Sequence, residues 1–289
     1  MKKNAKMKAL LGLAFLASLA GGAHAQVTFD EHVSSVRELY GVEQWSLGSL
    51  RDGLTLGELE LPGLLGAELR LKDGLIERAF TPADAPKDAG SALIVQALVA
   101  DSAEAAQDQL VLWLAGLTSP TAAPTDSEFG VDLGQAGYVG PSGSGPRAVS
   151  WVAFVQGNVA VRLLNADVEK HAALPLARLA AVVDAAVVAR DPLATGQAVP
   201  KPEIATFGAA ASVVAGRPAA LAVAVVDPRG GAAAFDWKIA GEGQGYVELR
   251  DGAWKFFPTG VGPVTITLTA IGSTGTTATR SVEIDVAHD

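Results

Sequence analysis

The sequence predicts two units: an α+β unit built on an antiparallel sheet with helices on one face, followed by an all-β sandwich. Segments before residue 193 mix helical with alternating apolar spacing, whereas segments after residue 201 alternate almost throughout. Three prolines fall within residues 190–208, between the two patterns, and proline disfavours a helix at the residue before it. We therefore assign the α+β unit, the linker and the sandwich to residues 26–193, 194–200 and 201–289.

The first 25 residues have the pattern of a secretory signal peptide. Four lysines lie within the first eight positions, an apolar run fills residues 9–20, and residues 23–25 form a cleavage site of the A-x-A type. The apolar run is too short for a stable membrane anchor. We expect the chain to be exported, to the periplasm or the outside of the cell, and to begin at Gln26 after cleavage.

Composition excludes several partners and chemistries. Without the four lysines of the leader, 18 basic and 31 acidic residues remain, a net charge of −13. A chain this acidic repels nucleic acid and anionic lipid. The absence of cysteine excludes disulfides, thiolate catalysis and cysteine metal sites, so the packed core must supply the stability.

The start of the first unit predicts a short helix and a strand meander. Residues 29–41 have the spacing of a helix, with Asp30 as its cap and Gly41 as its end. The alternating runs 54–63 and 66–74 predict strands, and the second of them ends in a Lys-Asp-Gly turn.

The rest of the first unit predicts a strand, a helix, a hairpin and a final helix. The continuous apolar run 91–101 suits a strand that is buried on both faces, and Asp101 begins a helix with a capping box. Residues 148–167 predict a hairpin that turns at Gly157. A broad apolar stripe in residues 176–192 predicts a helix that lies on the sheet.

Five short apolar runs in the second unit, split by turn residues at intervals of 8–12 positions, are typical of a β-sandwich. Trp237 lies where such sandwiches bury an aromatic side chain, so we predict that it anchors the core. The pattern resembles bacterial Ig-like and cadherin-like modules in a "DP.G" turn at 227–230, in Trp237, and in the runs 252–260 and 267–286. The chain lacks the cysteine pair of true Ig domains and the clustered acidic motifs of calcium-binding cadherins.

The first unit has a weaker resemblance. Its ending, "WVAFVQGNVAVRLL" followed by "LARLAAVVDAAV", resembles uncharacterised secreted bacterial α+β domains and PsbP/Mog1-like sandwiches. This resemblance implies a fold and no activity.

The glycine-rich stretch "GPSGSGPR", residues 140–147, invites a phosphate-binding interpretation. Pro146 and Arg147 stand where a P-loop needs lysine and serine or threonine, and an apolar strand pattern follows instead of a helix. The dinucleotide and nucleophile-elbow templates fail as well. We predict a mobile connection, with Arg147 kept as a candidate ligand contact because it could hold an anion.

No catalytic residue, cofactor or metal site is predicted. The mature chain has three histidines, and none lies in a motif for catalysis or zinc. Asp126, Glu128 and Asp132 suggest weak calcium binding, but they lack the spacing of an EF-hand, so we interpret them as surface residues.

Aromatic side chains supply the remaining candidates. Trp113 and Trp151 lie in apolar runs and are predicted to be core residues. Trp254, Phe256 and Phe257 suggest an exposed aromatic platform, but alternation places Trp254 and Phe256 on one face of a strand and Phe257 on the other, so we expect one of the two faces to pack into the core. Trp254 and Phe256 are therefore candidate ligand contacts.

Three functions stay open. The first is an exported, non-enzymatic interaction or binding module whose partner is an envelope protein or polysaccharide. The second is a carboxylate-dependent hydrolase of envelope polysaccharide with the sandwich as an accessory domain, which needs two close carboxylates, one with a raised pKa. The third is a small-ligand or envelope-assembly factor.

Overall fold

The structure is a computed structural model that describes residues 28–86, 88–116, 122–141, 149–166, 174–231 and 233–288. Residues 1–25 lie outside this range, so the signal peptide stays a prediction. The chain is predominantly β, with mostly antiparallel sheets and few helices. None of the described helices is long and apolar enough to cross a membrane.

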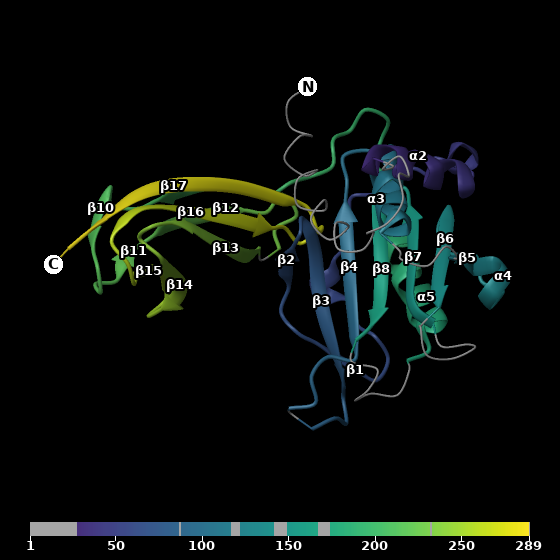
Figure 1. Cartoon of the computed structure of the whole chain (residues 1–289), viewed down its shortest axis with the longest axis horizontal. Helices are drawn as coiled ribbons and strands as arrows, with labels where there is room; N and C mark the ends of the chain where they lie inside the picture. The colour runs from purple at the N-terminus through teal and green to yellow at the C-terminus, as the bar shows by residue number, and fades with distance from the viewer. Residues whose placement is uncertain are drawn as a thin grey trace, which may run out of the picture.

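An eight-stranded antiparallel sheet forms the first unit, by which we mean the described part of residues 28–193 (Figure 1). The order of the strands is β1-β3-β4-β8-β7-β6-β5, and β2 also pairs with β3. The strands are β1 (Leu64–Gly66), β2 (Arg70–Lys72), β3 (Leu75–Pro82), β4 (Leu93–Val99), β5 (Ala123–Pro124), β6 (Ala136–Pro141), β7 (Val149–Gln156) and β8 (Val159–Asn165).

The predicted hairpin is confirmed. β7 and β8 join through a two-residue turn of Gly157 and Asn158, and Gly157 has the positive φ of 57° that such a turn requires. The buried Asn158 side chain accepts a hydrogen bond from the Arg51 amide at 2.6 Å and donates one to the Ala100 carbonyl at 3.0 Å. The turn therefore ties two other segments to the sheet.

The helices begin one or two residues away from the predicted caps. Thr28 caps the first helix in place of Asp30, because Thr28 and Glu31 form a reciprocal capping box. Ser102 caps the second in place of Asp101 and accepts a hydrogen bond from the Ala105 amide. The helices are α2 (Phe29–Leu39), α3 (Ala103–Ala115), α4 (Thr125–Phe129) and α5 (Leu176–Val188), with short 3₁₀ turns η1 (Val42–Gln44) and η2 (Leu56–Glu58).

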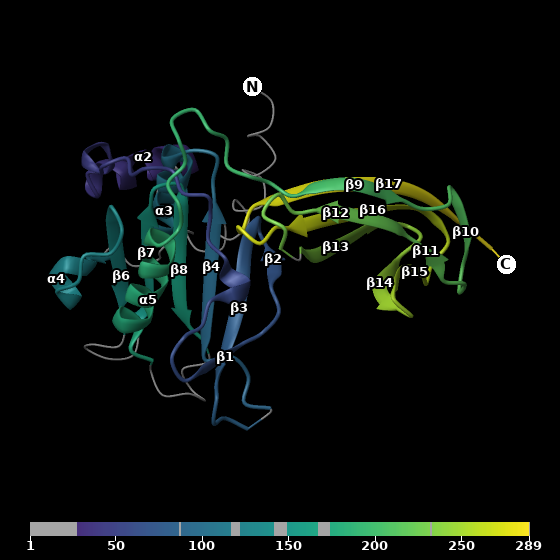
Figure 2. The same ribbon diagram turned by 180° about the vertical axis from the view of Figure 1, so that it is seen from behind.

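The long helices α3 and α5 cover opposite faces of the sheet, so the predicted arrangement with helices on one face is wrong. Val152 and Phe154 of β7 pack in the core with α5, whereas Ala153 and Val155 pack in the core with α3. Figure 2 shows α5 in front of β7 and β8. Because both faces are covered, the central strands read as nearly continuous apolar runs.

The predicted strand at 54–63 is also wrong. Its leucines, including Leu54 and Leu56, are buried in the core that contains α5, but the segment contains the turn η2 and belongs to no sheet. The Leu54 amide donates to the Thr274 carbonyl of the second unit at 2.8 Å. The alternating apolar pattern of residues 54–63 therefore reflects which side chains are buried and does not indicate a strand. The run 66–74 does contain β2, and the turn that follows it lies at Asp73 and Gly74.

All regular elements of the second unit, the described part of residues 201–288, are strands. Sheets β10-β17-β16-β13, β11-β15-β14 and β12-β9 enclose one apolar core, as in a β-sandwich. The strands are β9 (Glu203–Gly208), β10 (Ser212–Val214), β11 (Ala219–Ala220), β12 (Ala222–Val226), β13 (Ala234–Gly241), β14 (Gly245–Arg250), β15 (Ala253–Pro258), β16 (Gly262–Ile271) and β17 (Thr277–Ala287).

Trp237 on β13 is half-buried beside this core, whereas we predicted a core anchor. The centre of its ring lies 5.8 Å from the Phe207 ring and 5.2 Å from the Trp254 ring. Its buried Nε1 has no hydrogen-bond partner among the described residues. Phe256 on β15 is fully buried in the same core, whereas Trp237 packs against its margin.

The two units meet where the turn between β16 and β17 reaches the first unit. Ile271, at the end of β16, is buried in the same core cluster as α5. The Thr276 hydroxyl donates to the Pro200 carbonyl at 2.6 Å, which fixes the end of the connecting segment. An exposed ion pair between Lys201 and Asp101, at 2.8 Å, adds a further contact.

Asp52 is the buried charge at this junction. Its side chain is only 4% exposed, and its two carboxylate oxygens face two guanidinium groups. Arg190 of the first unit bonds Oδ1 at 2.9 Å, and Arg229 of the second unit bonds Oδ2 at 2.8 Å. A carboxylate buried to this degree requires such partners, because burial removes its hydration.

Replacing Asp52 by asparagine should therefore destabilise the chain. We expect the free energy of unfolding to fall by about 2 kcal/mol in urea melts, less than for a fully buried pair because both arginines reach solvent. The matched control is Asp101→Asn, which removes an exposed ion pair and should cost at most about 0.5 kcal/mol. Equal effects of the two substitutions would contradict the role of Asp52.

Replacing Trp237 by alanine should cost about 3 kcal/mol, the lower end of the range for a large aromatic, because its ring is only half-buried. Tyr246→Ala, at an exposed position, should cost less than about 1 kcal/mol. Urea melts that follow fluorescence give both values. A cost for Trp237→Ala as small as that for Tyr246→Ala would show that the indole contributes little to the core.

Candidate functional site

The outer face of the β14–β15 hairpin carries an aromatic pair, the exposed Tyr246 and the half-buried Phe257. Tyr246 and Phe257 are cross-strand partners, and their rings are stacked with centres 4.9 Å apart and planes 5° apart. Tyr246 is 51% exposed. The guanidinium of Arg250 lies 5.8 Å from the centre of the Phe257 ring, within the range of a cation–π contact.

Charged groups flank this pair on the same face. Glu248 lies opposite Lys255 in the ladder, between the aromatic pair and the turn. Lys255 also forms an ion pair with Asp251 at 3.0 Å. We call the set Tyr246, Glu248, Arg250, Lys255 and Phe257 the hairpin face. Figure 1 shows β14 and β15 at the end of the sandwich that is far from the first unit.

The structure places the predicted contacts Trp254 and Phe256 on the inner side of this hairpin. Both lie on one face, as alternation predicted, but that face packs into the core. Phe256 is 0% exposed and cannot meet a ligand from solvent, so this prediction was wrong. Trp254 is half-buried against the rings of Phe235 and Trp237, which makes it mainly a packing residue.

A turn signal in the sequence identifies the aromatic pair of the outer face. Asp251-Gly252 is a typical two-residue hairpin turn, and both residues have positive φ, 54° and 74°. Counting back from this turn pairs position 250 with 253 and position 246 with 257. The register therefore places Tyr246 beside Phe257 on the face opposite to Trp254.

Arg147, the third candidate contact, lies outside the described residues, as does most of the glycine-rich stretch. The described ends of that stretch show its place in the fold. β6 ends at Pro141 and β7 begins at Val149, and the two strands are antiparallel neighbours. A strand therefore follows the glycines, in agreement with the failure of the P-loop template, whereas the mobility of the loop and the role of Arg147 stay predictions.

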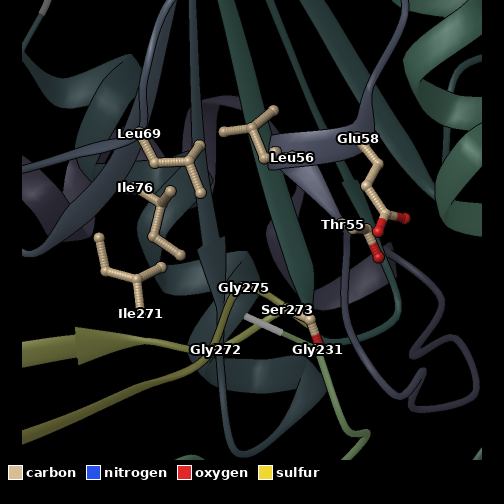
Figure 3. A pocket seen from close by; sticks show the side chains of 11 residues that line it. Thr55, Leu56, Glu58, Leu69, Ile76, Gly231, Ile271, Gly272, Ser273 and Gly275 are labelled. Atoms are coloured by element: carbon tan, nitrogen blue, oxygen red, sulfur yellow. The ribbon is translucent and has the colours of Figure 1, made fainter. Parts of the chain in front are cut away.

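A second candidate site lies at the junction of the two units. A pocket of about 240 Å³ opens between η2, the sheet and the β16–β17 turn. Figure 3 shows aliphatic side chains, among them Leu69, Ile76 and Ile271, on one side and the oxygen-bearing side chains of Thr55, Glu58 and Ser273 on the other.

Asp184, a half-buried carboxylate, lies outside both sites. Burial raises the pKa of Asp184 on α5, and the nearby charge of Asp132 raises it further, although a hydrogen bond from the Gly134 amide opposes the shift. Oδ1 of Asp184 is buried without a hydrogen-bond partner among the described residues. A carboxylate with a raised pKa is one of the two groups that a hydrolase interpretation requires, and the pocket described above lies elsewhere.

The histidines and acidic loop residues form no metal centre within the described part of the chain, where no three His, Asp or Glu side chains lie close enough to hold an ion. The ring of His32 lies 2.9 Å from the Ala115 carbonyl and joins α2 to α3. Asp126 accepts a hydrogen bond from the Ser127 amide at 2.7 Å. His171 lies outside the described residues.

No family model matches the chain, and no curated protein matches it. Among solved structures, the chain is similar to one described as "Tandem Ig repeats of Dlar", with 10% identity and a TM-score of 0.25 over 53% of this chain and 89% of that chain. At this TM-score the likeness carries no argument. The description of the second unit as a sandwich rests on its own strand pairing, and the resemblance of the first unit to secreted α+β domains stays an expectation.

Asp184→Asn should stabilise the protein near neutral pH. Folding raises the pKa of the Asp184 carboxyl, so ionising this group lowers the stability of the native state. This loss of stability is absent at low pH, where the carboxyl is protonated, and is present above the folded pKa. The melting temperature of Asp184→Asn should exceed that of the wild type at about pH 7, and the two should converge near about pH 3. A lower melting temperature for the variant at neutral pH would contradict the burial argument.

Proposed function

We propose that the chain is an exported, non-enzymatic binding protein whose Ig-like sandwich presents the hairpin face to a polysaccharide of the cell envelope. The observation that carries this proposal is the stacked, half-exposed pair of Tyr246 and Phe257 at the far end of the sandwich. Exposed apolar surface that is rimmed by polar residues is typical of binding sites on soluble proteins. The signal-peptide pattern supports export.

The chemistry of the hairpin face favours a sugar chain over a protein partner. Sugar rings offer C–H faces that pack on aromatic rings and hydroxyls that bond to charged side chains. The face combines two aromatic rings with Glu248, Arg250 and Lys255, which both donate and accept hydrogen bonds. Protein interfaces, in contrast, are depleted of lysine and glutamate at their centres.

The hairpin face is also protected against non-specific pairing with other strands. β14 is an edge strand of its sheet, and an open edge invites the addition of further strands. Glu248 and Arg250 place charges along this edge, which discourages such pairing. The side chains, rather than the open backbone, are thus the surface offered to a partner.

The test is co-sedimentation with protease-treated cell-wall polysaccharide. We expect the wild type to sediment with the wall, and Tyr246→Ala and Phe257→Ala to lose affinity at least about tenfold, or about 1.4 kcal/mol, as expected for loss of a central aromatic contact. Phe29→Ala, which removes a partly exposed aromatic from α2, is the matched control and should bind as the wild type does. Wild-type binding by Tyr246→Ala would overturn the proposal, and binding that vanishes on protease treatment would show a protein partner instead.

A second candidate function, hydrolysis of envelope polysaccharide by carboxylate catalysis, is favoured by Asp184 and its neighbour Asp132. In this case the same polysaccharide should release reducing ends. Release should be lost in Asp184→Asn and retained in Asp126→Asn, an acidic control on α4. Release that is absent from the wild type would leave binding as the function.

A further inference from the structure

We propose that the pocket at the junction is a binding site for a small molecule that has one apolar ring or branched chain and ends in a protonated amine. This inference is independent of the proposed polysaccharide binding. It concerns a different surface, more than one unit contributes to it, and its lining residues are all described.

The apolar side of the pocket is fixed in place. Leu56, Ile76 and Ile271 are each at most 2% exposed and belong to the main core of the first unit. Such side chains cannot move into the space without opening a void elsewhere, because protein cores are close-packed. The pocket is therefore preformed, and an apolar cavity of roughly 150 Å³ already holds a benzene molecule.

Glycines allow backbone segments of the two units to approach each other closely at the other walls of the pocket. A Cβ atom on Gly231 would lie 2.6 Å from Cβ of Ser273, and a Cβ on Gly275 would lie 2.7 Å from the Leu54 carbonyl oxygen. Gly275 also has a φ of 79°, which favours glycine. The close approach of backbone to pocket lets two units share one small site.

The polar side of the pocket favours a ligand with a positive charge. Its side-chain polar atoms are the oxygens of Thr55, Glu58 and Ser273, and no lysine, arginine or histidine belongs to the lining. Two arginines near the lining residues have other partners: the Arg78 guanidinium donates to the Leu56 and Leu59 carbonyls at 2.9 Å, and Arg229 bonds the Asp52 carboxylate at 2.8 Å. An ammonium group complements such a wall, since it donates three hydrogen bonds and accepts none. The acidic chain as a whole attracts cations as well.

The experiment compares two probes of equal shape, 2-phenylethylamine and 2-phenylethanol, by NMR titration of the full chain. We expect the amine to bind saturably with a Kd of about 1 mM, as befits a ligand with so few atoms. The alcohol should bind about five- to tenfold more weakly, because a charge-assisted hydrogen bond to Glu58 is lost.

Glu58→Gln should reduce amine affinity to that of the alcohol, and it should leave alcohol affinity unchanged. Glu60→Gln is the matched control, since Glu60 is an exposed carboxylate two positions away that does not line the pocket. Leu69→Trp, which fills the apolar side, should abolish binding of both probes. Absence of saturable binding at 20-fold the expected Kd, or equal amine affinity in Glu58→Gln and the wild type, would overturn the proposal.

Discussion

The placing of the two units depends on one buried carboxylate. Asp52 lies within two residues of Leu54, whose amide bonds the second unit, and its oxygens hold one guanidinium from each unit. A buried carboxylate with a single partner would be poorly compensated, so the second arginine gives the two units a common electrostatic requirement. The segment that follows Asp52 turns toward the second unit, where the Leu54 amide bonds the Thr274 carbonyl, and its residues 55–58 then form one wall of the pocket.

The order of the elements was more predictable than their surroundings. The hairpin at Gly157 and the strands of the second unit follow from local turn chemistry and alternation, which depend on neighbours in sequence. Local sequence patterns do not specify which face of the sheet a helix packs on, so the placing of α3 and α5 on opposite faces could not be predicted. The apolar run of β4 did indicate two-sided burial, and it contradicted the one-faced arrangement from the start.

The candidate sites were less predictable, for two physical reasons. Alternation correctly paired Trp254 with Phe256 but did not say which face of the strand meets the core; the register set by Asp251-Gly252 and the burial of Phe256 decide that. The junction pocket joins residues near 55, 76 and 272, which are far apart in sequence and meet only through tertiary contact. No motif marks such a site, because its walls are common aliphatic residues and glycines.

The burial of the β16–β17 turn has a consequence for how this chain could have been assembled. In a freely shuffled module, the loops at both ends face water, so the module can be moved between hosts. Here Ile271, Thr274 and Gly275 are buried, and Ile271 belongs to the core of the neighbouring unit. Transplanting this sandwich alone would expose an apolar tip, whereas grafting new specificity onto its far end would leave the joint intact. The two units are therefore built as a matched pair, and β14 and β15 are the part of the sandwich that can be altered without disturbing their joint.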